Sequence, residues 1–225
     1  MTRLTAPLPV ADLVRLHDRV ISWFEVNKRD LPWRGGASPW AVMVSEFMLQ
    51  QTPVARVIPV YESWIERWPT PSALAADSPG DAVRAWGRLG YPRRALRLHA
   101  AAAAIVERHD GQVPDALEDL LSLPGVGSYT AAAVSSFAFG GREVVLDTNV
   151  RRVFARIVNG QQFPASSLIS AERDLATSLM PADDAHVWAA ATMELGALIC
   201  TARSPRCDQC PVAHLCRWRA AGYPE

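Results

Sequence analysis

Four cysteines stand close together near the C-terminal end of the chain. They fall within the last 26 of 225 residues, with the spacing C-x6-C-x2-C-x5-C: Cys200, Cys207, Cys210 and Cys216. In a reducing compartment such a group predicts a metal site rather than disulfides. A four-cysteine zinc site usually has two C-x2-C pairs, and only Cys207 and Cys210 form one here. The uneven spacing therefore favours a [4Fe–4S] cluster, with zinc and unligated thiols as the alternatives.

Composition narrows the class of protein further. Hydrophobic residues make up 49% of the chain and charged residues 20%, with a formal net charge of zero. This balance excludes an intrinsically disordered chain, which combines low hydrophobicity with high net charge. No run of about 18 apolar residues occurs, so we expect no membrane segment and a cytoplasmic location.

Apolar residues recur with a helical period along most of the chain, and no stretch shows sustained strand alternation. We therefore expect an all-α protein of roughly ten helices, with residues 143–146 as at most a brief extended segment. Prolines and glycines mark the ends of the expected helices. The expected helical ranges are 12–26, 40–51, 54–68, 72–76, 81–89, 93–108, 116–122, 129–139, 150–158, 171–180 and 187–199.

A glycine-rich turn, LPGVGSYT at residues 123–130, separates two of these helices. Pro124 ends the first helix, while Gly125 and Gly127 permit positive φ values and close backbone approach. The next helix opens with N–H groups that attract an anion. Such a turn either grips a DNA phosphate without reading sequence or is an ordinary helical hairpin.

Arginines gather in a second stretch. Five of them occupy 14 positions that contain no acidic residue: Arg84, Arg88, Arg93, Arg94 and Arg97. A run of this kind forms either a solvated helix face or a phosphate-binding surface.

These motifs together resemble the endonuclease III superfamily of helix–hairpin–helix DNA glycosylases. The resemblance rests on LPGVGSYT, on Asp147 in VLDTNVRRV 17 residues after Thr130, and on the cysteine spacing. The segments SEFMLQQT (45–52), DLPWR (30–34) and GRLGY (87–91) resemble the MutY branch, whose members release adenine opposite 8-oxoguanine.

The resemblance implies a two-lobed helix–hairpin–helix glycosylase fold with a C-terminal [4Fe–4S] loop. It further implies a six-helix barrel domain with the hairpin at residues 36–143. Residues 1–35 and 144–225 would then form the iron–sulfur domain.

Two carboxylates suit the chemistry of an N-glycosidic bond, because one acid must protonate the base and one carboxylate must stabilise the sugar cation. Glu46 has apolar neighbours on its expected helix, which raise the pKa of a carboxyl group toward the range of a general acid. Asp147 precedes an expected helix, whose dipole favours its ionised form and which it also caps. We expect Glu46 to act on the base and Asp147 on the sugar.

The residue at the superfamily's catalytic-lysine position is Tyr129, and Lys28 is the only lysine of the chain. A tyrosine forms no Schiff base, so we expect hydrolysis without efficient strand cleavage. Its hydroxyl would support the sugar site, and Asn149 would position the attacking water.

The resemblance also implies which residues contact DNA. Gln51 would fill the stack vacated by the extruded base, and Tyr91 would wedge beside the opposite base. Arg93, Arg94 and Arg97 would neutralise phosphate. The implied DNA-binding set is Gln50, Gln51, Tyr91, Arg93, Pro124, Gly125, Val126, Gly127 and Ser128. The implied base pocket is Arg29, Trp33 and Arg34.

The chain departs from the MutY pattern at three places. Pro92 stands where a second tyrosine is usual, and Ala190 stands where a Gln or Glu often reads the adenine edge. Glu194 lies one turn further along the same expected helix. MutY proteins carry a C-terminal domain that recognises 8-oxoguanine, whereas this chain stops nine residues after Cys216, so we expect either a truncated catalytic core or a naturally short enzyme.

We therefore expect a monomeric, nucleoid-associated glycosylase that removes adenine from A·8-oxoguanine or A·G pairs in double-stranded DNA. A thymine or uracil mismatch glycosylase is the alternative within the superfamily. A non-catalytic iron–sulfur DNA-binding module is the alternative from another class.

Overall fold

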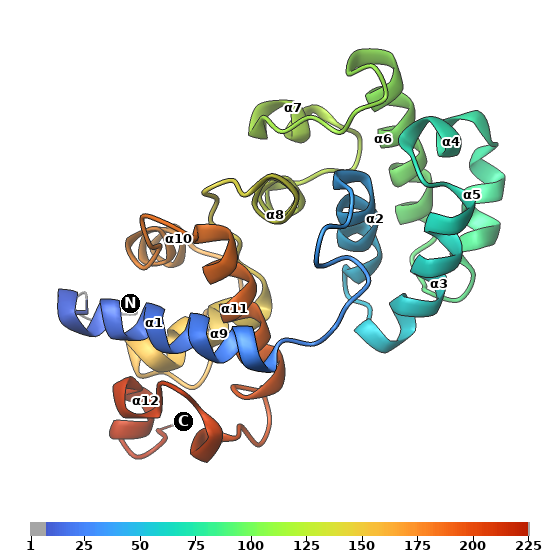
Figure 1. The fold of residues 1–225 in the computed structure, drawn as a ribbon. Coiled ribbons are helices and arrows are strands. Elements are labelled where there is room, and N and C mark those ends of the chain that lie inside the picture. The colour runs from blue at the N-terminus through green and yellow to red at the C-terminus, as the bar shows by residue number, and fades with distance from the viewer. Residues whose placement is uncertain (1–7, 225) are drawn as a thin grey trace. The chain divides into compact units, whose positions relative to one another are not determined.

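The structure is a computed structural model that describes residues 8–224. Residues 1–7, which the sequence assigns to the iron–sulfur domain, lie outside the described residues. All regular elements of residues 8–224 are helical, as expected, and Figure 1 shows coiled ribbons without arrows. The chain divides into two units, one of residues 30–141 and one of residues 1–29 with 142–225. Within residues 8–224, no helix is both long and apolar enough to cross a membrane.

The unit from Asp30 to Gly141 contains seven helices in sequence order. They are α2 (Pro39–Leu49), α3 (Val54–Arg67), α4 (Pro71–Ala76), α5 (Pro79–Trp86), α6 (Arg93–Arg108), α7 (Leu117–Ser122) and α8 (Ser128–Phe139). Three of these helices start in the same way. Ser38, Thr70 and Ser78 cap α2, α4 and α5, and each is followed by a proline at the first helical position. The hydroxyl accepts a backbone N–H, and proline removes a donor that would have no partner there.

Tryptophans make up the centre of this unit. Trp64 packs edge-on against Trp68 and Trp86, with ring centroids 4.6 and 5.5 Å apart. Leu98 and Ile105 of α6 and Val134 of α8 belong to the same buried cluster. The hairpin helices α7 and α8 are therefore anchored on one continuous apolar core.

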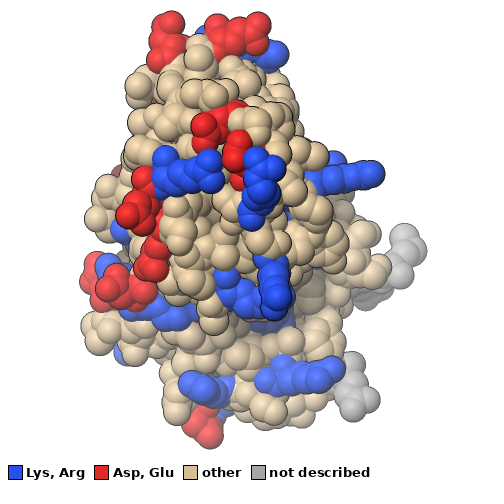
Figure 2. Space-filling model, turned by 90° about the vertical axis from the view of Figure 1, so that its right-hand side faces the viewer, with Lys and Arg blue, Asp and Glu red and all other residues tan. Residues whose placement is uncertain are grey.

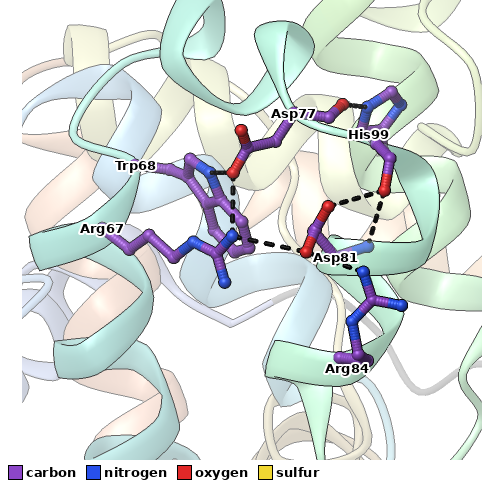
Figure 3. Close-up of polar contacts among 7 residues, drawn as sticks. Arg67, Trp68, Asp77, Asp81, Arg84 and His99 are labelled. Atoms are coloured by element: carbon purple, nitrogen blue, oxygen red, sulfur yellow. Dashed lines mark hydrogen bonds and ion pairs between the residues drawn. The ribbon is translucent and has the colours of Figure 1, made fainter.

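A polar network closes the corner where α3, α4, α5 and α6 meet (Figure 3). Asp77 accepts hydrogen bonds from Arg67 at 2.9 Å and from the Trp68 indole at 3.0 Å. His99 Nε2 lies 2.8 Å from the Asp77 carbonyl oxygen, and Asp81 pairs with Arg84 at 2.7 Å. The contact between His99 and Asp77 joins α6, which carries Arg93, Arg94 and Arg97, to the end of α4.

The second unit contains the remaining elements. They are α1 (Val10–Asn27), α9 (Thr148–Phe154), η1 (Ala155–Asn159), α10 (Ser170–Ser178), α11 (Ala185–Leu198), η2 (Cys207–Gln209), η3 (Ala213–Leu215) and α12 (Arg217–Ala220). Leu16, Val20 and Phe24 of α1 are buried in the same cluster as Val153 and Leu195. Its apolar core therefore joins α1, α9 and α11.

Several expected boundaries are wrong. The helix expected at 81–89 ends at Trp86, because Gly87 has φ +55° and turns the chain before Gly90. The helix expected at 150–158 is α9 followed by the π-helical η1, which ends at Gly160. The short helix α12 was not expected. Residues 143–146 form no strand.

Candidate active site

The glycine-rich turn joins α7 to α8. Val126 N donates to Leu123 O at 3.1 Å, and both side chains are buried in the unit's core. Gly127 is the N-cap of α8, and no side chain caps that helix. The exposed Ser128 begins the helix, so its first turn offers backbone N–H groups and the positive dipole end to an anion.

The two glycines of this turn have different reasons to be glycine. Gly125 has φ +78°, and an added Cβ would lie 2.6 Å from the Arg97 Cβ. Gly127 has φ −94°, so the expected positive φ is wrong at this position. A Cβ on Gly127 would meet nothing within 4 Å. Packing inside the protein therefore requires Gly125, whereas the space beside Gly127 is open to an approaching molecule.

Two short segments of this unit each carry an exposed central side chain: residues 50–52, the Gln51 tip, and residues 90–92, the Tyr91 tip. Gln51 is exposed with φ +55°, and Tyr91 is 63% exposed with φ +48°. Positive φ is uncommon for residues other than glycine and marks sites that the surrounding structure holds in place. Gln50 Nε2 donates to Thr130 Oγ1 at 3.4 Å, which connects the Gln51 tip to α8.

The arginine run is not one continuous phosphate-binding surface. Arg93 and Arg97 are exposed, as a phosphate contact requires. Arg94 is buried and donates to backbone carbonyl oxygens, so the expectation that it binds phosphate is wrong. Arg84 pairs with Asp81. Basic and acidic side chains both occupy the face in Figure 2, in keeping with the zero net charge.

Glu46 lies on α2, where every residue from Trp40 to Met48 is buried. Only 5% of Glu46 is exposed. Trp33 is buried in the core cluster of the same unit, with its ring 5.2 Å from that of Tyr61 in an edge-on contact. The carboxyl group of Glu46 is therefore held in a largely apolar part of the unit, as its sequence neighbours predict.

Asp147 is the N-cap of α9 in the other unit. Its Oδ1 accepts the Val150 N–H at 2.7 Å, and its Oδ2 accepts from the Asn149 amide at 2.8 Å. Asn149 Oδ1 in turn accepts from Arg152 Nη2 at 2.8 Å. Arg152 also donates to the Cys200 carbonyl oxygen at 2.8 Å, so hydrogen bonds run from Asp147 to the first cysteine.

Two opposing effects act on the Asp147 carboxyl group. Burial raises its pKa and is the larger effect. The hydrogen bonds from Val150 and Asn149 and the charge of Arg152 lower the pKa. The helix start therefore favours the ionised form, as expected, but does not fully offset burial.

The expected base-pocket residues do not all fall in one unit. Arg29 ends the first segment of one unit, and Trp33 and the half-buried Arg34 belong to the other. Arg29 pairs with Glu194, with Nη2 2.7 Å from Oε2 and Nε 2.8 Å from Oε1. The hydrogen bond to Glu194 raises the pKa of Arg29. Glu194 is fully buried in this pair, and Ala190 is half-buried one turn earlier.

The cysteines lie on a segment with little regular structure, from Cys200 after α11 to Cys216 before α12. All four thiols are free and half-buried. Arg156 Nη1 lies 3.5 Å from Cys200 Sγ, and backbone N–H groups of Val212 and Trp218 donate to Cys210 and Cys216. These donors stabilise thiolates rather than thiols.

The four thiols also influence one another. Burial raises the pKa of Cys210 to about 12 and raises those of Cys200 and Cys216, and neighbouring thiols act in the same direction. Within residues 8–224, no three His, Cys, Asp or Glu side chains form a set around a single metal ion. Four free thiols in one short segment offer one donor to each corner iron of a [4Fe–4S] cluster, so the number and kind of these donors fit an iron–sulfur cluster.

Sequence reasoning missed three buried arginines: Arg94, Arg152 and Arg156. Each donates mainly to backbone carbonyl oxygens of distant segments. For Arg94 a signal was present, because it shares a helical stripe with the buried Leu98, Ala101 and Ile105.

Comparisons with known proteins agree with this geometry. Residues 44–178 match the family model of the HhH-GPD superfamily of base excision DNA repair proteins. Residues 200–216 match the iron–sulfur binding domain of endonuclease III. The second match covers all four cysteines.

The chain is 54% identical over 208 residues to the adenine DNA glycosylase of Mycolicibacterium smegmatis, covering 91% of this chain and 70% of that protein. It is 34% identical to the thymine/uracil-DNA glycosylase of Pyrobaculum aerophilum, covering 90% of each. A thermostable thymine-DNA glycosylase structure matches with a TM-score of 0.84 and 26% identity, over 94% of this chain and 98% of that one.

These matches span both units and include the turn, the Asp147 segment and the cysteine loop. They support an enzyme rather than a non-catalytic binding module. The chain belongs to the HhH-GPD superfamily of base excision DNA repair proteins, as a DNA N-glycosylase with an endonuclease III-type iron–sulfur domain.

Proposed function

We propose that this chain hydrolyses the N-glycosidic bond of adenine mispaired with 8-oxoguanine or guanine in double-stranded DNA. It acts as a monomer, leaves the DNA strand intact and carries a [4Fe–4S] cluster. The observation that carries the proposal is the 54% identity to an adenine DNA glycosylase over 91% of the chain.

Glu46 is the proposed general acid, which protonates a ring nitrogen of adenine and makes the base a better leaving group. Its burial on α2 supports this role, because a carboxyl group in an apolar setting retains its proton to higher pH.

Asp147 is the proposed stabiliser of the sugar cation. Its two oxygens are held by the Val150 N–H and the Asn149 amide, so the carboxylate has a fixed orientation. A preorientated carboxylate stabilises developing positive charge without reorganisation. Asn149 is assigned the positioning of the attacking water in addition to its contact with Asp147.

The absence of an amine at position 129 supports hydrolysis over the lyase reaction. Tyr129 is half-buried at the start of α8, and the single lysine, Lys28, is exposed at the end of α1. Tyr129 is assigned a hydroxyl contact to the sugar.

The turn from Pro124 to Ser128 is assigned to one DNA phosphate. Gln51 and Tyr91 are assigned to the base stack, Gln50 to a contact with DNA, and the exposed Arg93 to phosphate. The open space beside Gly127 and the exposure of both tips support these assignments. Binding through phosphates should weaken steeply as salt concentration rises.

Cys200, Cys207, Cys210 and Cys216 would hold the [4Fe–4S] cluster. When bound, it supplies four ligand bonds that tie the segment after α11 to α12. An iron-to-protein ratio near four with broad visible absorbance tests this part, and a zinc-containing colourless protein would contradict it.

The function is tested by single-turnover cleavage of three duplexes that contain A opposite 8-oxoguanine, A opposite G, and T opposite G. Each reaction is analysed with and without alkali, which breaks the strand at abasic sites. We expect adenine release from the first two duplexes, with strand breaks only after alkali.

Glu46→Gln tests the general acid, because the amide keeps the size of the side chain and its capacity to form hydrogen bonds but removes the acidic proton. We expect it to slow adenine release by about 10²- to 10⁴-fold. Release at the wild-type rate would contradict the role of Glu46.

A thymine or uracil mismatch glycosylase is the second candidate. Ala190 favours it, because this residue offers no polar group to an adenine edge. The similarity to the Pyrobaculum thymine/uracil-DNA glycosylase also favours it. Thymine release from the T·G duplex without adenine release would select this candidate.

A further inference from the structure

One buried arginine contacts both exposed tips of the Asp30–Gly141 unit. Arg94 is on the first turn of α6 and is 5% exposed. Its Nη1 donates to Met48 O at 3.0 Å, Phe47 O at 3.2 Å and Gln50 O. Its Nη2 donates to Thr52 Oγ1 at 2.9 Å and Gly90 O at 3.1 Å, with Leu89 O at 3.4 Å. The two ends of one guanidinium therefore hold two segments about 40 residues apart in sequence.

Two of the carbonyl groups that accept from Arg94 directly precede the central residues of the two tips. Gln50 O belongs to the peptide that leads into Gln51, and Gly90 O belongs to the peptide that leads into Tyr91. Both Gln51 and Tyr91 have a left-handed backbone conformation, with φ of +55° and +48°. A left-handed backbone conformation is strained for a residue other than glycine, so the surrounding structure must hold it in place. A hydrogen bond to the preceding carbonyl fixes the peptide plane that determines this φ.

Packing reinforces the same arrangement. The Arg94 guanidinium lies 5.3 Å from the Trp86 ring centroid and 5.4 Å from the Tyr91 ring centroid. The Trp86 indole donates to the same Gly90 carbonyl at 3.0 Å. Arg94 is thus held between a core tryptophan and the side chain of one tip.

We propose that Arg94 is a positioning residue that holds the Gln51 tip and the Tyr91 tip together in their left-handed conformations before DNA binds. This role rests on the proposed function, in which Gln51 and Tyr91 enter the base stack. Preorganised tips avoid the ordering cost at the moment of base extrusion. Because Arg94 donates to both tips, displacement of one tip would also disturb the hydrogen bonds that hold the other.

The fork of the guanidinium is required for this role. Nη1 reaches the carbonyl oxygens of residues 47, 48 and 50, whereas Nη2 reaches both Thr52 Oγ1 and the carbonyl oxygens of residues 89 and 90. A lysine ammonium is a single point and cannot occupy both positions. Arg94→Lys therefore keeps the positive charge but loses one of the two sets of contacts, and Arg94→Met loses the charge and both sets.

Hydrogen exchange without DNA tests the positioning directly. The variants Arg94→Lys and Arg94→Met are compared with Ile105→Ala, which removes a buried side chain on the same helix about 16 Å away. We expect exchange in peptides spanning 49–53 and 88–92 to rise by about tenfold or more in both Arg94 variants. Ile105→Ala should leave the ratio of tip to core exchange unchanged. Unchanged exchange at either tip in folded Arg94→Met would overturn the proposal.

Base release provides the second test, through a double-mutant cycle. Arg94→Met is introduced into the wild type and into a Gln51→Ala/Tyr91→Ala background, and single-turnover release is measured. We expect a loss of about tenfold or more in the wild type and within about twofold in the background, because the side chains that Arg94 positions are already gone. Equal losses in both backgrounds would overturn the proposal, as would wild-type activity in Arg94→Lys. Ile105→Ala should change the rate of base release by the same factor in the wild type and in the Gln51→Ala/Tyr91→Ala background.

Failure of the proposed function has a different signature. If the wild-type protein releases no base from any duplex, the function fails, while hydrogen exchange of the DNA-free protein still decides the role of Arg94.

Discussion

The α7–α8 turn and the cysteine segment both contain little regular helix, yet different interactions stabilise them. In the turn, Leu120, Leu123 and Val126 are buried in a continuous core. In the cysteine segment, Val212 is the only buried side chain between Ile199 and Trp218 among the described residues. Side-chain packing therefore forms the turn, whereas the cysteine segment lacks the apolar surface to form by packing alone.

This difference indicates what stabilises each of the two segments. The α7–α8 turn is available to a ligand in a preformed state. The cysteine segment is held by hydrogen bonds from Arg152 and Arg156 and, in the proposed function, by ligation of its four thiols. Substitutions in the two segments should therefore have separable effects.

Removal of one ligand should give the largest effect. We expect Cys210→Ala to lose the cluster and to destabilise its unit by about 4 kcal/mol or more, because ligation free energy is folding free energy. Limited proteolysis mapped by mass spectrometry should find cuts within residues 200–216 before any in the α7–α8 turn. Equal resistance of both segments in this variant would remove the distinction between them.

Gly125→Ala should have the next effect, on the turn rather than on the cysteine segment. The positive φ and the Cβ contact with Arg97 predict a loss of about 1–3 kcal/mol, measured by urea unfolding. The iron content should stay at the wild-type value. A stability change below about 0.5 kcal/mol would mean that the turn relaxes around the new side chain.

Asp147→Asn should change how stability depends on pH. Burial raises the pKa of Asp147, so the native state holds its proton to higher pH than the unfolded state does. The contribution of Asp147 to stability is therefore fully present below the ordinary pKa of 3.8 and is lost as pH rises through the native pKa. The Asn variant lacks this loss.

Chemical denaturation of both proteins between pH 4 and pH 8 measures the difference. The stability of Asp147→Asn relative to the wild type should increase with pH and then level off. A relative stability that decreases over this range would mean that the Val150, Asn149 and Arg152 interactions outweigh burial.

Gly127→Ala should give the smallest effect on stability and is the matched control for Gly125→Ala. Its Cβ meets open space, so the cost to stability is below about 1 kcal/mol, from the poorer helix cap alone. We expect DNA affinity to fall by about 2- to 10-fold through one weakened phosphate hydrogen bond. Unchanged affinity, measured by fluorescence anisotropy at fixed salt, would argue that this backbone does not approach DNA.

Much of the molecule followed from local sequence signals. The helical period predicted the all-α class and the bounds of α6, and Asp147 was expected to cap a helix. The cysteine spacing pointed to the segment that matches an iron–sulfur domain. These features depend on residues close together in the chain, where periodicity and capping act.

Other features were decided only by tertiary structure. The helical stripe of α6 favours burial at position 94 over position 93, but only the tertiary structure shows that Arg94 donates to carbonyl oxygens of two distant segments. Gly125 and Gly127 look alike in sequence, and only the approach of Arg97 separates their roles.

The physical reason is the same in both cases. The partners of Arg94 and Arg152 are mainly backbone carbonyl oxygens, which every residue type carries, so no sequence motif marks them. The four cysteines, in contrast, are chemically distinct and close in sequence. The sequence alone determined the helical class and the segment that matches an iron–sulfur domain. Folding decided which segments a buried arginine joins, because its partners lie more than 40 residues away in the chain.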